Sequence, residues 1–242
     1  MEGKMKIEIW SDIACPYCYI GKKKLQQALE QFPHKDKIVL EYHCYELNPN
    51  LPKKALEKSF FDYFAESHRM TLDEVKANCQ QIAELGKTVN IDFNFEKLVV
   101  ANTSDALRVE KLAQSKGLAD KIGDLFYKAY FTDGKDVSDR ATLIRIGTQI
   151  GLTESEIIKM LDSDAYLMEM EKDIDYSENG LNLEYIPFYL FNNKHIVQGS
   201  ISVEDYLNVL TKSYDEWEKS GVAHDPTDII SGQSCSIDGV CS

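Results

Sequence analysis

The order of strand-like and helix-like segments constrains this chain more than any other feature of its sequence. Residues 6–10 alternate between polar and apolar side chains, with Ile7 and Ile9 on one face, which predicts a β-strand. A helical pattern follows over about 17–31, and a second strand is expected over 38–46. Strand, helix and strand within about 40 residues predict a parallel crossover, because parallel strands need a connection of this length.

A long helical stretch then separates these elements from a second set of strands. From about residue 55 to 175 apolar side chains recur at helical spacing, and capping-box patterns mark helix starts at Thr71 and Thr153. Strand character returns over 188–198 as a hairpin, with a turn at Asn192. The sequence therefore predicts an α/β protein whose sheet is interrupted by one helical insertion.

The charge balance limits the partners that this chain can bind. It has 242 residues with 40 acidic and 27 basic side chains, for a formal net charge of −13. Such a field repels phosphate backbones and anionic lipids, and no basic stripe opposes it. Apolar runs are too short to cross a membrane, and the N-terminus lacks the apolar core of a secretion signal. We therefore expect a cytosolic protein that binds neither nucleic acid nor membrane.

Two of the six cysteines lie where the first strand meets the first helix. Cys15 and Cys18 enclose Pro16 and Tyr17, and Cys15 falls at or near the helix N-cap, where backbone N–H groups and the helix dipole favour a thiolate. In this motif the pKa of the first thiol falls to between about 3.5 and 7. Cys18 follows one turn later, close enough to attack a mixed disulfide on Cys15. The pattern predicts a redox-active pair.

Two other uses of this cysteine pair are weaker. Structural zinc takes four ligands, usually from two such pairs, and Cys235 and Cys241 are spaced too widely to supply the second pair. We therefore expect no metal site. Inert buried thiols are the remaining alternative, but in a reducing compartment a close pair is more typical of redox chemistry or metal binding.

The other four cysteines fall into two groups. Cys79 shares an apolar helical stripe and Cys44 alternates in phase with the apolar residues of the second strand, so both are expected to be core thiols. Cys235 and Cys241 lie in a polar tail where packing does not explain them, and a turn at Asp238 would bring them together. A second redox pair and two unspecific tail thiols remain open.

Asp12 lies three residues before Cys15. It is either a proton acceptor or a loop residue that braces the end of the strand. Because a carboxylate this close to a thiol raises the thiol pKa unless it is offset, the structural role is favoured.

The residues around the cysteine pair carry a resemblance to a known family. The pattern Trp10-Ser-Asp-x-x-Cys15-Pro-Tyr-Cys18-Tyr-Ile-Gly21 resembles the DsbA family of thioredoxin-like oxidoreductases, and in particular its cytosolic FrnE-like branch. The likeness continues in later segments of the chain: Glu46–Pro49, Ala101–Thr103, Asp105–Arg108, Ala129–Asp136 and Ile186–Phe188.

The resemblance implies a thioredoxin-like fold with a large, all-helical insertion domain. The thioredoxin-like domain would comprise residues 1–50 and 180–215, and the insertion residues 51–179. Residues 216–242 would form a flexible C-terminal arm that carries Cys235 and Cys241, a pair comparable to one found in FrnE-like proteins.

The same resemblance assigns roles near the cysteine pair. Pro187 would be a cis proline that faces the cysteines, and Ile186 would offer its backbone to the substrate chain. Pro16 and Tyr17 are expected to contact the substrate as well. Tyr17 replaces the Trp or His that is more common between the family's cysteines, so the family's redox potential does not carry over.

The resulting expectation is a protein thiol–disulfide oxidoreductase, a reductase or isomerase that acts through Cys15 and Cys18. It requires no cofactor, and glutathione or the thioredoxin system would reduce it. One alternative is a glutathione-dependent isomerase or transferase of the kappa-class or hydroxychromene-carboxylate isomerase type, which shares the insertion but typically lacks the full cysteine pair. A second is a holdase-type chaperone that uses the helical insertion. The direction of electron flow, the protein substrate and the oligomeric state stay open.

Overall fold

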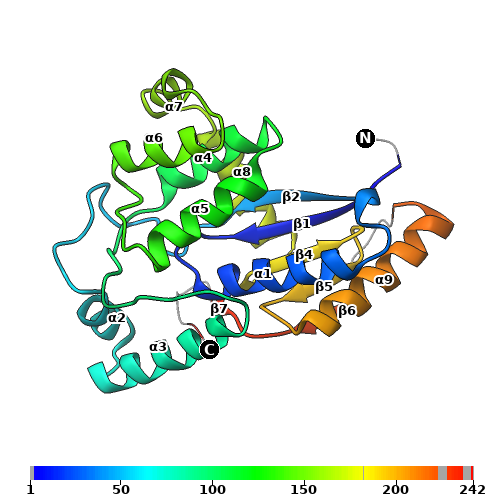
Figure 1. The fold of residues 1–242 in the computed structure, drawn as a ribbon, viewed down its shortest axis with the longest axis horizontal. Coiled ribbons are helices and arrows are strands. Elements are labelled where there is room, and N and C mark those ends of the chain that lie inside the picture. The colour runs from blue at the N-terminus through cyan, green and yellow to red at the C-terminus, as the bar shows by residue number, and fades with distance from the viewer. Residues whose placement is uncertain (1–2, 182, 223–227, 237–240, 242) are drawn as a thin grey trace. The chain divides into compact units, whose positions relative to one another are not determined.

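The computed structural model of this chain describes residues 3–181, 183–222, 228–236 and 241. Its contacts divide the chain into two compact units, each assembled from segments that lie far apart in the sequence (Figure 1). The first unit takes its described residues from 1–11, 17–45 and 173–242, and the second from 12–16 and 46–172. The boundary between the units therefore falls inside the segment that carries the first two cysteines.

The first unit contains the strands together with the helices near the two ends of the chain. The strands are β1 (Met5–Ser11), β2 (Ile38–Cys44), β3 (Tyr185–Ile186), β4 (Phe188–Phe191), β5 (His195–Gln198), β6 (Asp228–Ser231) and β7 (Cys235–Ser236). The helices are α1 (Pro16–Gln31), whose first residue belongs to the second unit, the short turns η1 (Lys35–Lys37) and η2 (Tyr176–Gly180), and α9 (Val203–Ser220).

Five of these strands form one mixed sheet in the order β2-β1-β4-β5-β6. β1 and β2 are parallel, which confirms the predicted crossover through α1. β4 and β5 are antiparallel, and Asn192 and Asn193 between them have φ values of 49° and 54°. Because Asn tolerates positive φ better than most residues, the expected hairpin turn is confirmed as well.

Side chains of successive strand residues point to opposite faces of this sheet, and both faces are covered. Tyr189 of β4 contacts Tyr206 of α9 with the ring centroids 5.3 Å apart, and α1 lies beside α9 on this face (Figure 1). Trp10 and Phe188 project from the opposite face, where Trp10 approaches Tyr176 of η2. All of these rings except Tyr176 are almost completely buried, so they form the core on both sides of the sheet.

The second unit is helical, as the sequence predicts for the stretch after the second strand. Its helices are α2 (Phe60–His68), α3 (Leu72–Lys87), α4 (Ser104–Gln114), α5 (Ala119–Phe131), α6 (Arg140–Gln149), α7 (Glu154–Leu161) and α8 (Leu167–Asp175), which ends in the first unit. Both predicted capping boxes are present, at the starts of α3 and α7. Each supplies two of the hydrogen bonds that a helix N-terminus otherwise lacks.

The C-terminal segment, expected to be a flexible arm, contains two short strands among its described residues. β6 adds to the edge of the sheet beside β5, and β7 pairs with β3 as a separate two-stranded sheet. The turn expected at Asp238 lies outside the described residues. In the part of the chain that the structure describes, no helix combines the length and the apolar character needed to cross a membrane.

Candidate active site

The loop between β1 and α1 places Cys15 directly before a helix. The backbone N–H of Cys15 donates a hydrogen bond to the carbonyl of Asp12 at 3.1 Å, and α1 begins at the next residue, Pro16. Pro16 suits the first helical position because the N–H group that it lacks would have no partner within the helix. Cys15 therefore lies directly before the first N–H groups of α1, at the helix position that the sequence predicts.

Cys18 lies in the first turn of α1, on the face that packs against the strand after Pro187. A Cβ atom at Gly21 would lie 2.5 Å from the Tyr189 hydroxyl and 3.2 Å from Cγ of Pro187, so α1 approaches β4 very closely at this point. Residues three apart share one helix face, which places Cys18 on the same side as Gly21. The Tyr206 hydroxyl would lie 3.2 Å from the same Cβ atom, and burial, with a smaller contribution from Cys18, raises the pKa of Tyr206.

The Ile186–Pro187 peptide bond is cis. The resemblance implied this isomer at Pro187. Ile186 is fully buried as the last residue of β3, whereas Tyr185 is 39% exposed.

The two residues between the cysteines are buried, and so are the cysteines themselves. Tyr17 is 3% exposed, Cys18 is 2% exposed, and Cys15 has no exposed surface. The structure holds both cysteines as thiols. The Tyr17 side chain therefore lies in the core, in contrast to the open position expected of a residue that contacts substrate.

Asp12 is a buried carboxylate at the base of this loop. One of its oxygens accepts a hydrogen bond from the backbone N–H of Ala14 at 3.1 Å, and the other accepts one from Leu47 at 2.8 Å. Burial nevertheless raises the pKa of Asp12 to about 6, against these hydrogen bonds and one from the Thr103 side chain. The expected bracing role is visible in the hydrogen bonds, and the raised pKa adds a group that titrates near neutral pH.

The helical unit supplies further residues around Asp12. No local sequence pattern identified these residues as part of the site. The Tyr127 hydroxyl lies 3.4 Å from the Asp12 carbonyl. Burial raises the pKa of Tyr130, and the Asp12 carboxylate raises it further. Thr103 and Tyr130 fall in two segments that carry the family resemblance, which was the only signal in the sequence that could have found them.

The C-terminal cysteines lie next to Pro187 rather than in an isolated tail. Cys235 and Cys241 form a disulfide. Cys235 is fully buried and lies opposite Ile186 in the β3–β7 pairing. The structure therefore brings the C-terminal pair to the strand that ends at the cis proline.

The remaining cysteines are core thiols, as predicted. Cys44 and Cys79 are 3% and 7% exposed. Burial raises the pKa of Cys79 to about 12, and Glu96 adds to this effect. A thiol with this pKa is almost entirely protonated at neutral pH and is a poor nucleophile.

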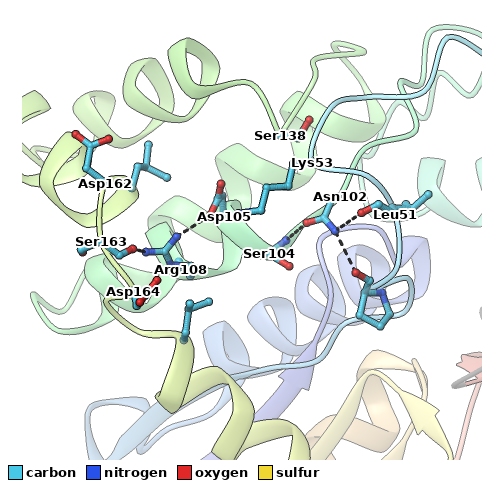
Figure 2. Close-up of a pocket in the computed structure, with 13 residues that line it drawn as sticks. Leu51, Lys53, Asn102, Ser104, Asp105, Arg108, Ser138, Asp162, Ser163 and Asp164 are labelled. Atoms are coloured by element: carbon cyan, nitrogen blue, oxygen red, sulfur yellow. Dashed lines mark hydrogen bonds and ion pairs between the residues drawn. The ribbon is translucent and has the colours of Figure 1, made fainter.

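A polar cavity of about 400 Å³ lies within the helical unit (Figure 2). The Arg108 guanidinium at its wall donates to Asp105 and to the carbonyls of Met160, Ser163 and Ala165. The Asn102 amide donates to the Leu51 carbonyl at 3.0 Å, as Figure 2 shows. Since these polar groups already have partners within the protein, they hold the surrounding loops in place.

One group of side chains among the described residues could converge on a metal ion: Glu8, Glu41 and His43. The Lys6 ammonium lies 3.1 Å from Glu8 and 3.0 Å from Glu41, where it forms an ion pair with each carboxylate. His43 Nδ1 lies 2.7 Å from Asp173. These contacts form a set of ion pairs and hydrogen bonds around β1 and β2.

Comparison with known proteins relates most of this chain to one family. The sequence profile of the DSBA-like thioredoxin domain matches residues 6–211. The structure is similar to a probable DsbA oxidoreductase from Streptomyces coelicolor, with 26% identity, 98% of each chain covered and a TM-score of 0.82.

Two solved structures of lower identity share the fold. The cytosolic disulfide reductase DsbM of Pseudomonas aeruginosa is 13% identical, with a TM-score of 0.54 and coverage of 88% of this chain and 97% of that one. A 2-hydroxychromene-2-carboxylate isomerase is also 13% identical, with a TM-score of 0.60 and coverage of 91% of this chain and all of that one. These likenesses show an α/β, thioredoxin-like fold with a helical insertion.

Proposed function

Since the chain belongs to the DSBA-like thioredoxin domain family, we propose that it is a thiol–disulfide oxidoreductase that reduces or isomerises disulfides of protein substrates. Cys15 is the attacking thiol in this proposal and Cys18 the resolving one. Pro187 and Ile186 position the substrate chain, and Pro16 and Tyr17 complete its surroundings once the site opens.

One observation carries this proposal: the first turns of α1 pack against the residues that follow the cis peptide bond. The close approach of Gly21 to Pro187 and Tyr189 keeps Cys18 on the side of α1 that faces β4. Cys15 directly precedes α1, at the N-terminus of the helix. A pair of thiols one turn apart in this position suits two successive exchange steps.

The reaction transfers two electrons from the cysteine pair to the substrate. The Cys15 thiolate attacks one sulfur of a substrate disulfide, and the other substrate sulfur leaves as a thiolate that takes up a proton. Cys18 then loses its proton and attacks the Cys15 sulfur, which forms the Cys15–Cys18 disulfide and releases the second substrate thiol. In isomerisation, a substrate thiol attacks the mixed disulfide instead, and the cysteine pair ends as it began.

A further reductant must restore the thiols for the cycle to continue. Two molecules of glutathione, or one dithiol such as reduced thioredoxin, supply the two electrons and are themselves oxidised to a disulfide. A solved structure of DsbM contains glutathione, which supports this choice of reductant. We place the reaction in the cytosol, where the glutathione pool keeps thiols reduced.

A glutathione-dependent isomerase is a second candidate, supported by the fold shared with a 2-hydroxychromene-2-carboxylate isomerase. Such an enzyme would activate glutathione and would not need the second cysteine. The presence of both Cys15 and Cys18 favours the oxidoreductase.

Turnover of a protein disulfide separates these candidates. With insulin as substrate and glutathione as reductant, Cys15→Ser should abolish turnover, because the nucleophile is lost. Cys18→Ser should accumulate a covalent adduct between Cys15 and insulin, detected by intact-protein mass spectrometry. Cys79→Ala, which removes a core thiol, is the matched control and should retain turnover.

Either of two results would contradict the oxidoreductase proposal. If Cys18→Ser binds glutathione tightly and keeps its catalytic activity without forming the adduct, the glutathione-dependent candidate replaces the oxidoreductase. If wild type and Cys15→Ser suppress aggregation of insulin chains equally well and neither reduces insulin, the chain is a holdase.

We also propose that Cys235 and Cys241 form a second redox pair. Their position beside Ile186 supports an exchange in which the Cys15–Cys18 dithiol reduces the Cys235–Cys241 disulfide and becomes a disulfide itself. Two electrons pass within one chain, so no other reactant is needed for this step.

A further inference from the structure

The backbone edge of β3 is occupied by the C-terminal segment of the same chain. β7 pairs with β3 in antiparallel orientation, with Tyr185 opposite Ser236 and Ile186 opposite Cys235. Ile186 is the residue whose backbone the proposed function assigns to the substrate chain. Substrate and β7 would therefore use the same hydrogen-bonding groups, next to Pro187.

The segment leading to β7 is fixed along the sheet edge by a continuous set of backbone hydrogen bonds. β6 runs parallel to β5, and the N–H of Gly232 then donates to the Gln198 carbonyl at 2.6 Å. Ser200 and Gln233 bond to each other in both directions, at 2.6 and 3.2 Å. These contacts bring Cys235 to β3 in one defined register.

Close approach of the two segments at this point depends on glycine. A Cβ atom at Gly232 would lie 2.5 Å from the Ser200 carbonyl oxygen and 2.8 Å from the Ile201 side chain. Because the nearest obstacle is backbone, a side chain at position 232 would force the two segments apart. The sequence at this position thus permits the C-terminal segment to dock.

The pairing of β7 with β3, at the end of this segment, is short. β7 has two residues, whereas β6 has four. Strands of this length form few hydrogen bonds, so little backbone pairing holds β7 against β3. An extended polypeptide that pairs with Tyr185 and Ile186 and makes further contacts beside them can therefore displace β7, in the way that peptides add to exposed sheet edges.

We propose that residues 235–236 are an intramolecular occupant of the polypeptide-binding edge of β3, and that a protein substrate must displace them before it reaches the cysteine pair. This inference rests on the proposed function and adds a control to it. The docked segment lowers the apparent affinity for polypeptide by the fraction of molecules in which the edge is open. Small disulfides that need no backbone pairing are not affected in this way.

Binding of a permanently unfolded polypeptide tests this inference without any redox step. The probe is fluorescently labelled α-lactalbumin that has been reduced and carboxymethylated, so that it holds no thiol or disulfide. The variants Ser236→Pro, which fixes φ and removes an N–H group within β7, and Gly232→Ala, which separates the segment from Ser200, each release the edge independently. Ser236→Ala keeps the backbone intact and is the matched control.

The docked segment should weaken binding several-fold, so both releasing variants should lower the dissociation constant for this probe by about fivefold or more, while Ser236→Ala matches wild type. Circular dichroism and the thermal transition verify that the variants are folded. Equal dissociation constants in all four folded proteins would overturn the inference.

The same four proteins separate this inference from the proposed function. If none of them reduces insulin but the releasing variants still bind the lactalbumin probe more tightly, the oxidoreductase proposal is wrong and the occupied edge is supported. If all of them reduce insulin with the same KM and the same probe affinity, the oxidoreductase proposal stands and the occupied edge is wrong.

Discussion

Asp12 holds an ionisable carboxylate in a buried position three residues before Cys15. Its oxygens accept hydrogen bonds from the N–H groups of Ala14 and Leu47, which fixes the loop that carries the cysteine. Burial is the larger effect and raises the pKa of this carboxyl group to about 6. One side chain can therefore brace the loop and also exchange a proton near neutral pH.

This pKa predicts a specific dependence of stability on pH. In the folded protein Asp12 keeps its proton up to a pH of about 6, whereas in the unfolded chain it loses it near the ordinary value of 3.8. Because the folded state binds more protons between these values, its contribution to the free energy of unfolding falls as the pH rises through this window. A shift of about two units corresponds to roughly 3 kcal/mol.

The comparison protein is Asp12→Asn, which cannot titrate at this position. Urea unfolding at a series of pH values should show wild type losing roughly 2 kcal/mol relative to Asp12→Asn between pH 4 and pH 7. Any constant cost of placing an amide at this site leaves that difference unchanged. Parallel pH profiles for the two proteins would show that Asp12 has an ordinary pKa.

At the scale of helices and strands, the contact between α1 and β4 positions the candidate site. Gly21 allows the helix to lie against Tyr189 and Pro187, and Tyr206 of α9 closes the same corner, 3.2 Å from a Cβ at position 21. A helix normally gains about 1 kcal/mol when Ala replaces Gly at an interior position. Here the added methyl group has no space.

Gly21→Ala should therefore destabilise the protein by about 1–3 kcal/mol instead of stabilising it, since overpacking a closed contact outweighs helix propensity. The nearest obstacle is the Tyr189 hydroxyl, so the same substitution should cost less in a Tyr189→Phe background. Thermal unfolding of the four proteins in this double-mutant cycle measures both quantities. A stabilised Gly21→Ala would mean that α1 and β4 are farther apart.

Local sequence rules predicted most elements, because the physical cause of each element is local. The alternation over 6–10, the capping boxes at Thr71 and Thr153 and the turn at Asn192 each involve neighbours in the sequence, and all are confirmed. The tight packing at Gly21 had no such signal. It depends on Tyr189 and Tyr206, which come from elements far along the chain.

At the scale of the whole molecule, the chain forms two units, and each unit combines segments that are far apart in the sequence. The first unit closes only when residues from 173 onward join β1 and β2. The sequence predicted this interrupted sheet from its order of strands and helices. It did not predict that residues 228–236 pair with β5 and β3, since a polar segment with two short strands resembles a loop when its partners are unknown.

The candidate site, like the fold, was predictable from the sequence only where its cause is local. The positions of Cys15 and Cys18 at a helix start could be read from adjacent residues, whereas the role of Pro187 came from a family resemblance. The surroundings of Asp12 required the fold, because Thr103 and Tyr130 are about ninety residues or more away in the sequence.

The central claim is that Cys15 and Cys18 exchange electrons as a pair, and a redox titration tests it most directly. The protein is equilibrated in graded glutathione buffers, and the alkylated fraction of each cysteine is measured by mass spectrometry. Cys79 serves as the internal control and should stay a thiol throughout, because its pKa is raised to about 12 and little thiolate is present. Cys235 and Cys241 are followed in the same samples and in Cys235→Ser with Cys241→Ser.

Cys15 and Cys18 should become oxidised together, with a single midpoint. A midpoint near about −270 mV would indicate a reductase, and one between about −180 and −120 mV an isomerase or oxidant. Removal of the C-terminal pair should change the resting oxidation state of Cys15 and Cys18 if the two pairs exchange electrons. If Cys15 and Cys18 never form a disulfide at any glutathione ratio, the oxidoreductase account is contradicted.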